Sequence, residues 1–129
     1  MGPQFLSSPV MGPFKLRVKV FNLREDERSL ETDLIVGTGA TYPVIPQALA
    51  SELHIEPSER RTFTLANDVR VSRGRGWAGI SHDGRKTPCL VVLGEGEDIP
   101  LLGAFALEGL GYEVDPVAKT LRPATQFLL

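Results

Sequence analysis

Residues 14–20 alternate strictly between apolar and basic side chains, in the order Phe-Lys-Leu-Arg-Val-Lys-Val. A period of two predicts a β-strand with one buried face and one wet face. The charged stretch at residues 22–31 is expected to be a hairpin connection after this strand. It leads into Leu-Ile-Val at residues 34–36, an apolar run typical of a strand that is covered on both faces.

Two hairpins are predicted in the middle of the chain. Residues 62–71 alternate on both sides of the polar pair Asn67-Asp68, which places a hairpin tip at residues 66–68. The pair Asp83-Gly84 is a strong two-residue turn signal. We expect it to join a strand at residues 77–80 to a strand at residues 89–93.

Two short helices complete the predicted elements. Pro46 suits the first turn of a helix at residues 47–53, and Gly111 would stop a helix at residues 104–110. A final strand at residues 112–114 is expected to turn toward residues 119–121. The pattern therefore predicts an all-β fold with one or two short helices.

Composition narrows the possible partners. The 129 residues are 42% hydrophobic and 23% charged, an ordinary balance for one globular domain. With 14 Lys and Arg against 16 Asp and Glu, there is no basic footprint for nucleic acid or an anionic membrane. A single cysteine, Cys89, permits no internal disulfide, so a reducing, cytoplasmic setting is expected. No leader segment is expected, and no apolar run comes near the ~20 residues of a membrane helix.

Four features, taken in order, resemble the retropepsin-like aspartic proteases. The apolar run at residues 34–36 is followed by Gly37-Thr38-Gly39-Ala40, then by the hairpin around Asn67, and late in the chain by Leu101-Leu102-Gly103 ahead of a helix. In that family the first motif reads apolar-apolar-Asp-Thr-Gly-Ala. The resemblance implies a closed β-barrel domain at residues 14–129, which acts as a homodimer on a polypeptide substrate. Residues 1–13 would be an N-terminal arm or an added extension.

The resemblance also implies a set of site residues. Thr38, Gly39 and Ala40 would form the active loop with position 37, and the Thr38 hydroxyl would bond across the dimer axis. Leu102 and Gly103 would pack beneath that loop. No cofactor or metal is implied, because water is the nucleophile. The flap that closes on a peptide would consist of Leu65, Ala66, Asn67, Asp68 and Val69.

The sequence departs from the family pattern at the catalytic position, where Gly37 replaces the aspartate. In these enzymes two carboxylates share one proton, so that one activates water while the other protonates the scissile carbonyl. Asp33 cannot take over, because four strand residues place it about 13 Å away. Either Gly37 is a substitution that disables an aspartic endopeptidase, or the chain is a pseudo-protease that serves as a peptide-binding or dimerisation module. The intact Thr-Gly-Ala remainder favours the first interpretation.

The remaining candidate residues receive structural interpretations. Cys89 lies within an apolar strand and is expected to be a core thiol rather than a nucleophile. Trp77 is expected in the core or in an interface. His54 and His82 are expected at the surface, with no metal-ligand spacing between them. The apolar residues 127–129 would be explained by burial in an intersubunit sheet or a neighbouring groove.

Overall fold

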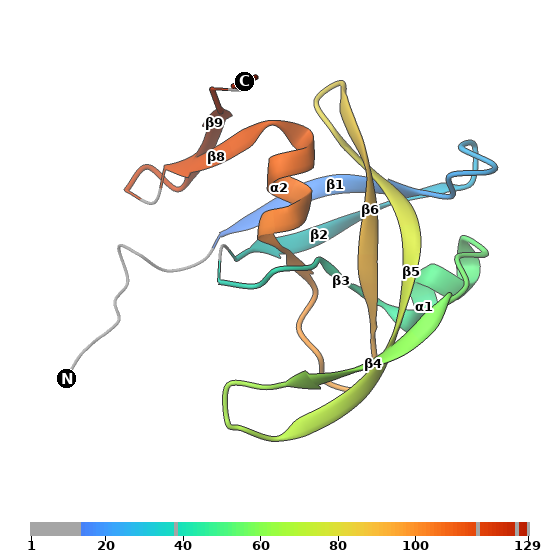
Figure 1. Ribbon diagram of the computed structural model, residues 1–129. Helices are drawn as coiled ribbons and strands as arrows, with labels where there is room; N and C mark the ends of the chain where they lie inside the picture. The colour runs from blue at the N-terminus through green and yellow to red at the C-terminus, as the bar shows by residue number, and fades with distance from the viewer. Residues whose placement is uncertain (1–13, 38, 116, 126, 129) are drawn as a thin grey trace.

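The computed structural model describes residues 14–128 apart from 38, 116 and 126 (Figure 1). Seven strands form one sheet in the order β1-β2-β7-β3-β6-β5-β4, and β8 and β9 form a separate two-stranded sheet. The strands are β1 (Lys15–Phe21), β2 (Ser29–Val36), β3 (Val44–Pro46), β4 (Glu59–Thr64), β5 (Arg70–His82), β6 (Arg85–Gly94), β7 (Leu101–Leu102), β8 (Tyr112–Asp115) and β9 (Thr120–Pro123). Two short helices are α1 (Gln47–Glu52) and α2 (Ala104–Leu110).

The large sheet closes on itself. Strand β1 pairs with β2 along its length and also with β5, where Lys19, Val20 and Phe21 face residues 81, 80 and 79. This second pairing turns six of the seven strands into a barrel and leaves β4 outside it, paired only with β5. The β4–β5 hairpin therefore extends from the barrel as an arm (Figure 1). The predicted all-β closed barrel with two short helices is confirmed.

A single apolar core fills the barrel. Leu34, Ile45, Ile80, Val91 and Leu102 are each 0% exposed, and they come from β2, β3, β5, β6 and β7. Burial of an aliphatic side chain of this size stabilises a fold by about 1.5–3 kcal/mol. Strand β1 adds Val18 and Val20, so all six strands of the ring, the two-residue β7 included, contribute to the same core.

Strand β2 begins earlier than the sequence predicted. Its first residue is Ser29, so the segment expected as a connection at residues 22–31 ends three residues sooner. The charged residues 24–28 do lie in the connection, whereas Glu31 lies on the solvent-exposed face of the strand. There Arg17 of β1 contacts Glu31 and Asp33 at 3.2 Å each. Asp33 is thus an ordinary surface ion-pair partner.

The length of strand β5 shows that a second prediction, that of two separate strands, is wrong. The strand expected after the hairpin tip at residues 66–68 and the strand expected at residues 77–80 belong to one 13-residue strand that begins at Arg70, although Gly74 and Gly76 lie between them. These glycines allow close approach rather than a break. A Cβ atom at Gly76 would lie 2.6 Å from the carbonyl oxygen of Glu56. The two predicted turns are present, with positive φ at Asp68, Asp83 and Gly84.

The exposure of individual side chains tests the predictions for Trp77, His82 and Cys89. Trp77 is 53% exposed, so the core alternative for this residue is wrong, and its place in an interface stays a prediction; Ala78 and Ile80 of β5 are buried instead. His82 is half-buried rather than on the surface, and its Nδ1 lies 2.9 Å from the Tyr112 hydroxyl. Cys89 is buried as predicted, and burial raises the pKa of its thiol to about 12.

No helix among the described residues is long and apolar enough to span a membrane.

Candidate active-site cleft

The loop after β2 makes a tight turn. The Gly37 N–H donates to the Leu102 carbonyl at 3.2 Å, and the Gly37 carbonyl accepts from the Ala40 N–H at 3.3 Å. Strand β7, which pairs in parallel with β2, therefore fixes the start of the loop. Gly39 is exposed and Ala40 is half-buried, while Thr38 lies outside the described residues.

The first residues of helix α2 are hydrogen-bonded to the same loop. The first N–H groups of a helix have no partner inside it. In α2 those of Ala104 and Phe105 donate to the carbonyls of Ala40 and Thr41 at 2.8 and 2.9 Å. Gly103 permits this approach, because a Cβ atom there would lie 2.7 Å from the carbonyl carbon of Tyr42. The structure thus brings Leu102 and Gly103 against the loop that begins at Gly37.

A cleft of about 780 Å³ opens between this loop, the hairpin arm and the segment that follows β6. Its wall is mainly apolar. Of the five residues predicted as a flap, Leu65 and Ala66 line the cleft, whereas Asn67, Asp68 and Val69 are exposed at the tip beyond it. The lining residues are Gly39, Ala40, Thr41, Tyr42, Val44, Phe63, Thr64, Leu65, Ala66, Val71, Arg73, Val92, Glu97, Asp98, Ile99 and Leu101.

An ion pair that the sequence did not indicate joins two walls of the cleft. Arg73 of β5 contacts Asp98 in the loop after β6, with Nε to Oδ2 at 2.5 Å and Nη2 to Oδ1 at 3.1 Å. Asp98 also accepts the Glu95 backbone N–H at 2.8 Å. Hydrogen bonding to Arg73 holds the pKa of Asp98 below its usual range. Asp98 is therefore committed to this contact and is not free to act as a general base.

A second arginine supports the ring of Tyr42. The guanidinium carbon of Arg75 lies 5.2 Å from the ring centroid, and Phe105 meets the same ring edge-on at 5.9 Å. Arg75 is 6% exposed and is hydrogen-bonded to Glu59, the residue opposite it in β4. That bond lowers the pKa of Glu59 and raises that of Arg75. Neither arginine carried a motif, so sequence reasoning missed both.

Position 37 has room for a side chain. A Cβ atom at Gly37 would meet only the Leu101 side chain, at an ordinary contact distance of 3.7 Å. The φ angle of Gly37 lies outside the left-handed region, so the backbone suits any residue. The acids that line the cleft among the described residues are Glu97 and Asp98. No group of three metal-ligating side chains occurs in the same described residues.

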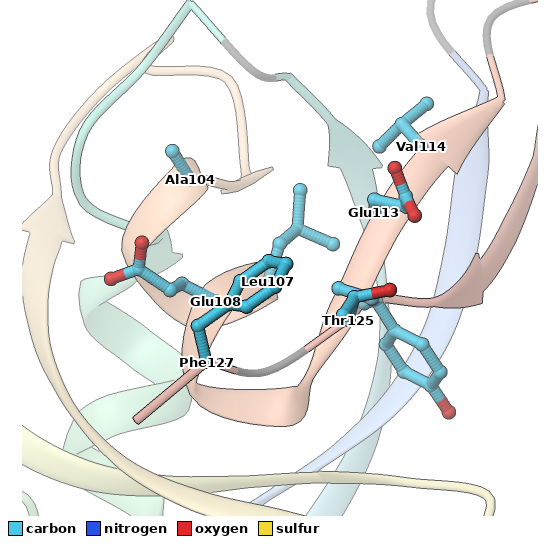
Figure 2. Close-up of a pocket in the computed structure, with 9 residues that line it drawn as sticks. Ala104, Leu107, Glu108, Glu113, Val114, Thr125 and Phe127 are labelled. Atoms are coloured by element: carbon cyan, nitrogen blue, oxygen red, sulfur yellow. The ribbon is translucent and has the colours of Figure 1, made fainter. Parts of the chain in front are cut away.

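A second hollow of about 610 Å³ lies on the other side of α2 (Figure 2). Figure 2 shows Leu107 and Glu108 of α2 on one side of it and Glu113 and Val114 of β8 on the other, with Phe127 alongside. Ala104, whose N–H donates to the carbonyl of Ala40, also lines this hollow.

Comparison with known proteins identifies the fold. No family profile matches the chain, and no curated protein matches it in sequence. Among solved structures, EIAV protease in an inhibitor complex is similar with a TM-score of 0.53 and 18% identity, over 85% of this chain and 99% of that one. A retropepsin-like aspartic protease from Rickettsia conorii is similar with a TM-score of 0.53 and 19% identity, over 81% and 77%. The resemblance to retropepsin-like aspartic proteases is thus confirmed at the level of the fold.

Proposed function

We propose that this chain is the protomer of a dimeric aspartic endopeptidase whose chemistry requires an aspartate at position 37. The observation that carries the proposal is the room for a side chain at Gly37, where a Cβ atom would have its nearest neighbour 3.7 Å away. The surrounding loop is supported by β7 and α2 and borders the apolar cleft. With glycine at this position, the chain is expected to bind polypeptides without cleaving them.

The chemistry requires two copies of the loop. One carboxylate accepts a proton from water while the other, protonated, donates to the carbonyl oxygen of the scissile bond. Each chain supplies one position 37, so two carboxylates can meet only across a two-fold axis. Exposed apolar side chains support a partner surface, since Phe127 is 82% and Leu128 is 99% exposed in the single chain.

The cleft suits an extended peptide. The hairpin arm lies across from the active loop, and Leu65 and Ala66 near its turn line the cleft. A peptide strand between them would place alternate side chains against the apolar walls, which is a common mode of peptide recognition. In this proposal the arm acts as a flap that closes over the bound chain.

A second candidate function is a peptide-binding or dimerisation module without hydrolysis. Gly37 itself favours this function, because it removes the carboxyl group from the loop. The pairing of Asp98 with Arg73 also favours it, since this cleft acid is not available as a replacement. The residue that the natural sequence carries at position 37 discriminates between the two functions: aspartate would favour the endopeptidase, and glycine would favour the binding module.

Three forms of the chain distinguish the two functions: the chain with Gly37, Gly37→Asp and Gly37→Asn. Each is incubated with an unfolded protein from about pH 4 to 7, where a shared-proton dyad operates. We expect cleavage, including self-cleavage, by the aspartate form alone, because asparagine has the same shape but cannot exchange the proton. If a folded dimer of the aspartate form cleaves nothing, the endopeptidase proposal is wrong and the binding module replaces it.

A further inference from the structure

Two side chains contact the ring of Tyr42 at the wall of the cleft. The Tyr42 backbone packs against Gly103, where a Cβ atom would lie 2.7 Å from the Tyr42 carbonyl carbon. Phe105 meets the ring edge-on at 5.9 Å between centroids, and the guanidinium carbon of Arg75 lies 5.2 Å from the ring centroid. A cleft side chain that is fixed in this way is preorganised, so binding does not have to order it.

Arg75 does not line the cleft, yet it is built into the structure at a cost. The guanidinium is buried, and its Nε has no hydrogen-bond partner among the described residues. A buried N–H without a partner destabilises a fold. The contacts that hold the group are its bond to Glu59 and its position over the Tyr42 ring. An apolar side chain would avoid the cost but would lose both contacts, so the cation serves the Glu59 carboxylate and the Tyr42 ring together.

Glu59 connects this arrangement to the hairpin arm. It is the first residue of β4, and it lies directly opposite Arg75 in the antiparallel pair. Glu59 at the base of the arm therefore contacts Arg75, and Arg75 contacts Tyr42, which lies two residues after Ala40. A planar guanidinium can bind a carboxylate and stack on a ring at the same time, which an ammonium group does less well.

We propose that Arg75 is a positioning residue that fixes the Tyr42 ring as a rigid wall of the cleft, and that this wall selects the size of the polypeptide side chain seated against it. The selection rests on the function proposed above, whereas the positioning does not. Loss of the guanidinium should let the ring move, so that the cleft accepts a wider range of side chains with lower affinity.

The positioning is tested on the unmodified chain by NMR with labelled tyrosine. The sequence has two tyrosines, Tyr42 and Tyr112, and each ring lies beside its own arginine, since Arg85 is 4.8 Å from the Tyr112 ring. Arg75→Met should shift the Tyr42 ring signals and speed its ring flips while Tyr112 stays unchanged. Arg85→Met, the matched control, should do the reverse. Arg75→Lys, which keeps the charge, should leave Tyr42 closer to its original signals. Unchanged Tyr42 signals in both Arg75 variants would overturn the proposal.

The selection is tested in the Gly37→Asp background with a peptide library. Adding Arg75→Met should raise KM for preferred peptides about three- to tenfold and leave kcat within about twofold, while the side-chain preference broadens. Adding Arg85→Met should change neither. An unchanged preference profile would overturn the selective role of Tyr42. If Gly37→Asp cleaves nothing, the proposed endopeptidase fails, and the same comparison is made on library binding by the unmodified chain, where an unchanged profile again overturns the selection.

Discussion

The substitution Gly103→Ala tests whether helix α2 supports the loop that follows β2. Gly103 is the N-cap of α2, with φ −79° and ψ 176°, a conformation that alanine adopts without strain. The added methyl carbon would lie 2.7 Å from the carbonyl carbon and oxygen of Tyr42 and 2.9 Å from the carbonyl oxygen of Ala40. In the folded chain the effect of the substitution is therefore steric, and it acts on the loop that borders the cleft.

The expected magnitude combines two opposing effects. Overpacking of a close contact costs about 1–3 kcal/mol, because backbone atoms must move apart. Replacing glycine by alanine also restricts the unfolded chain and returns about 0.4–1 kcal/mol. A net loss of about 1–2 kcal/mol remains. At roughly 2 cal/mol/K of unfolding entropy per residue, a chain of 129 residues should lose about 4–8 °C in Tm.

The assay is urea unfolding followed by circular dichroism at fixed protein concentration, since a dimer would make stability depend on concentration. Gly37→Ala is the matched control, because its methyl group meets only the Leu101 side chain at 3.7 Å. It should be as stable as the parent or slightly more stable. Equal stability of Gly103→Ala and Gly37→Ala would refute the close packing of the loop on α2.

Three further predictions concern the ion pair, the cysteine and the core. Arg73 lowers the pKa of Asp98, so the pair stabilises the fold at neutral pH and the contribution disappears as pH falls through the folded-state value. Asp98→Asn should therefore cost about 1–2 kcal/mol near pH 7 and progressively less as the pH is lowered and the Asp98 carboxylate of the parent becomes protonated, as measured by urea unfolding across the acidic range; a cost that does not change with pH would contradict it. Cys89 should resist a thiol reagent at about pH 8 until the chain is unfolded, because burial raises its pKa to about 12, and rapid labelling of the folded chain would argue against that burial. Leu102→Ala should lower the free energy of unfolding by about 2–5 kcal/mol, and a loss below about 1 kcal/mol would show that β7 is not part of the core.

Local patterns predicted the elements that depend on local chemistry. Both helices, the turns at Asp68 and at Asp83-Gly84, and the helix stop at Gly111 follow from side chains within a few residues of each feature. The continuous β5 strand did not, because Gly76 is explained by a distant contact with Glu56. The start of β2 was obscured in the same way, since Glu31 and Asp33 are paired with Arg17 of another strand.

Some residues of the candidate site could likewise be predicted from local sequence, and others could not. The motif around position 37 and the Leu102-Gly103 pair could be found in the sequence, because the resemblance has a fixed order along the chain. The pairs Arg73 with Asp98 and Arg75 with Tyr42 join residues 25 and 33 positions apart in separate elements. Such arginines resemble solvated surface charges until the barrel brings their partners to them, so no local pattern distinguishes them.

The most direct test of the central claim mixes two forms of the chain. Gly37→Asp is combined with the unmodified chain at constant total concentration, under conditions that let subunits exchange, and proteolysis is measured against the fraction of the aspartate form. If the site needs one carboxylate from each protomer, activity should follow the square of that fraction and fall to about a quarter at an equal mixture. A linear fall, to about half at the same point, would show that each chain acts alone and would contradict the shared dyad.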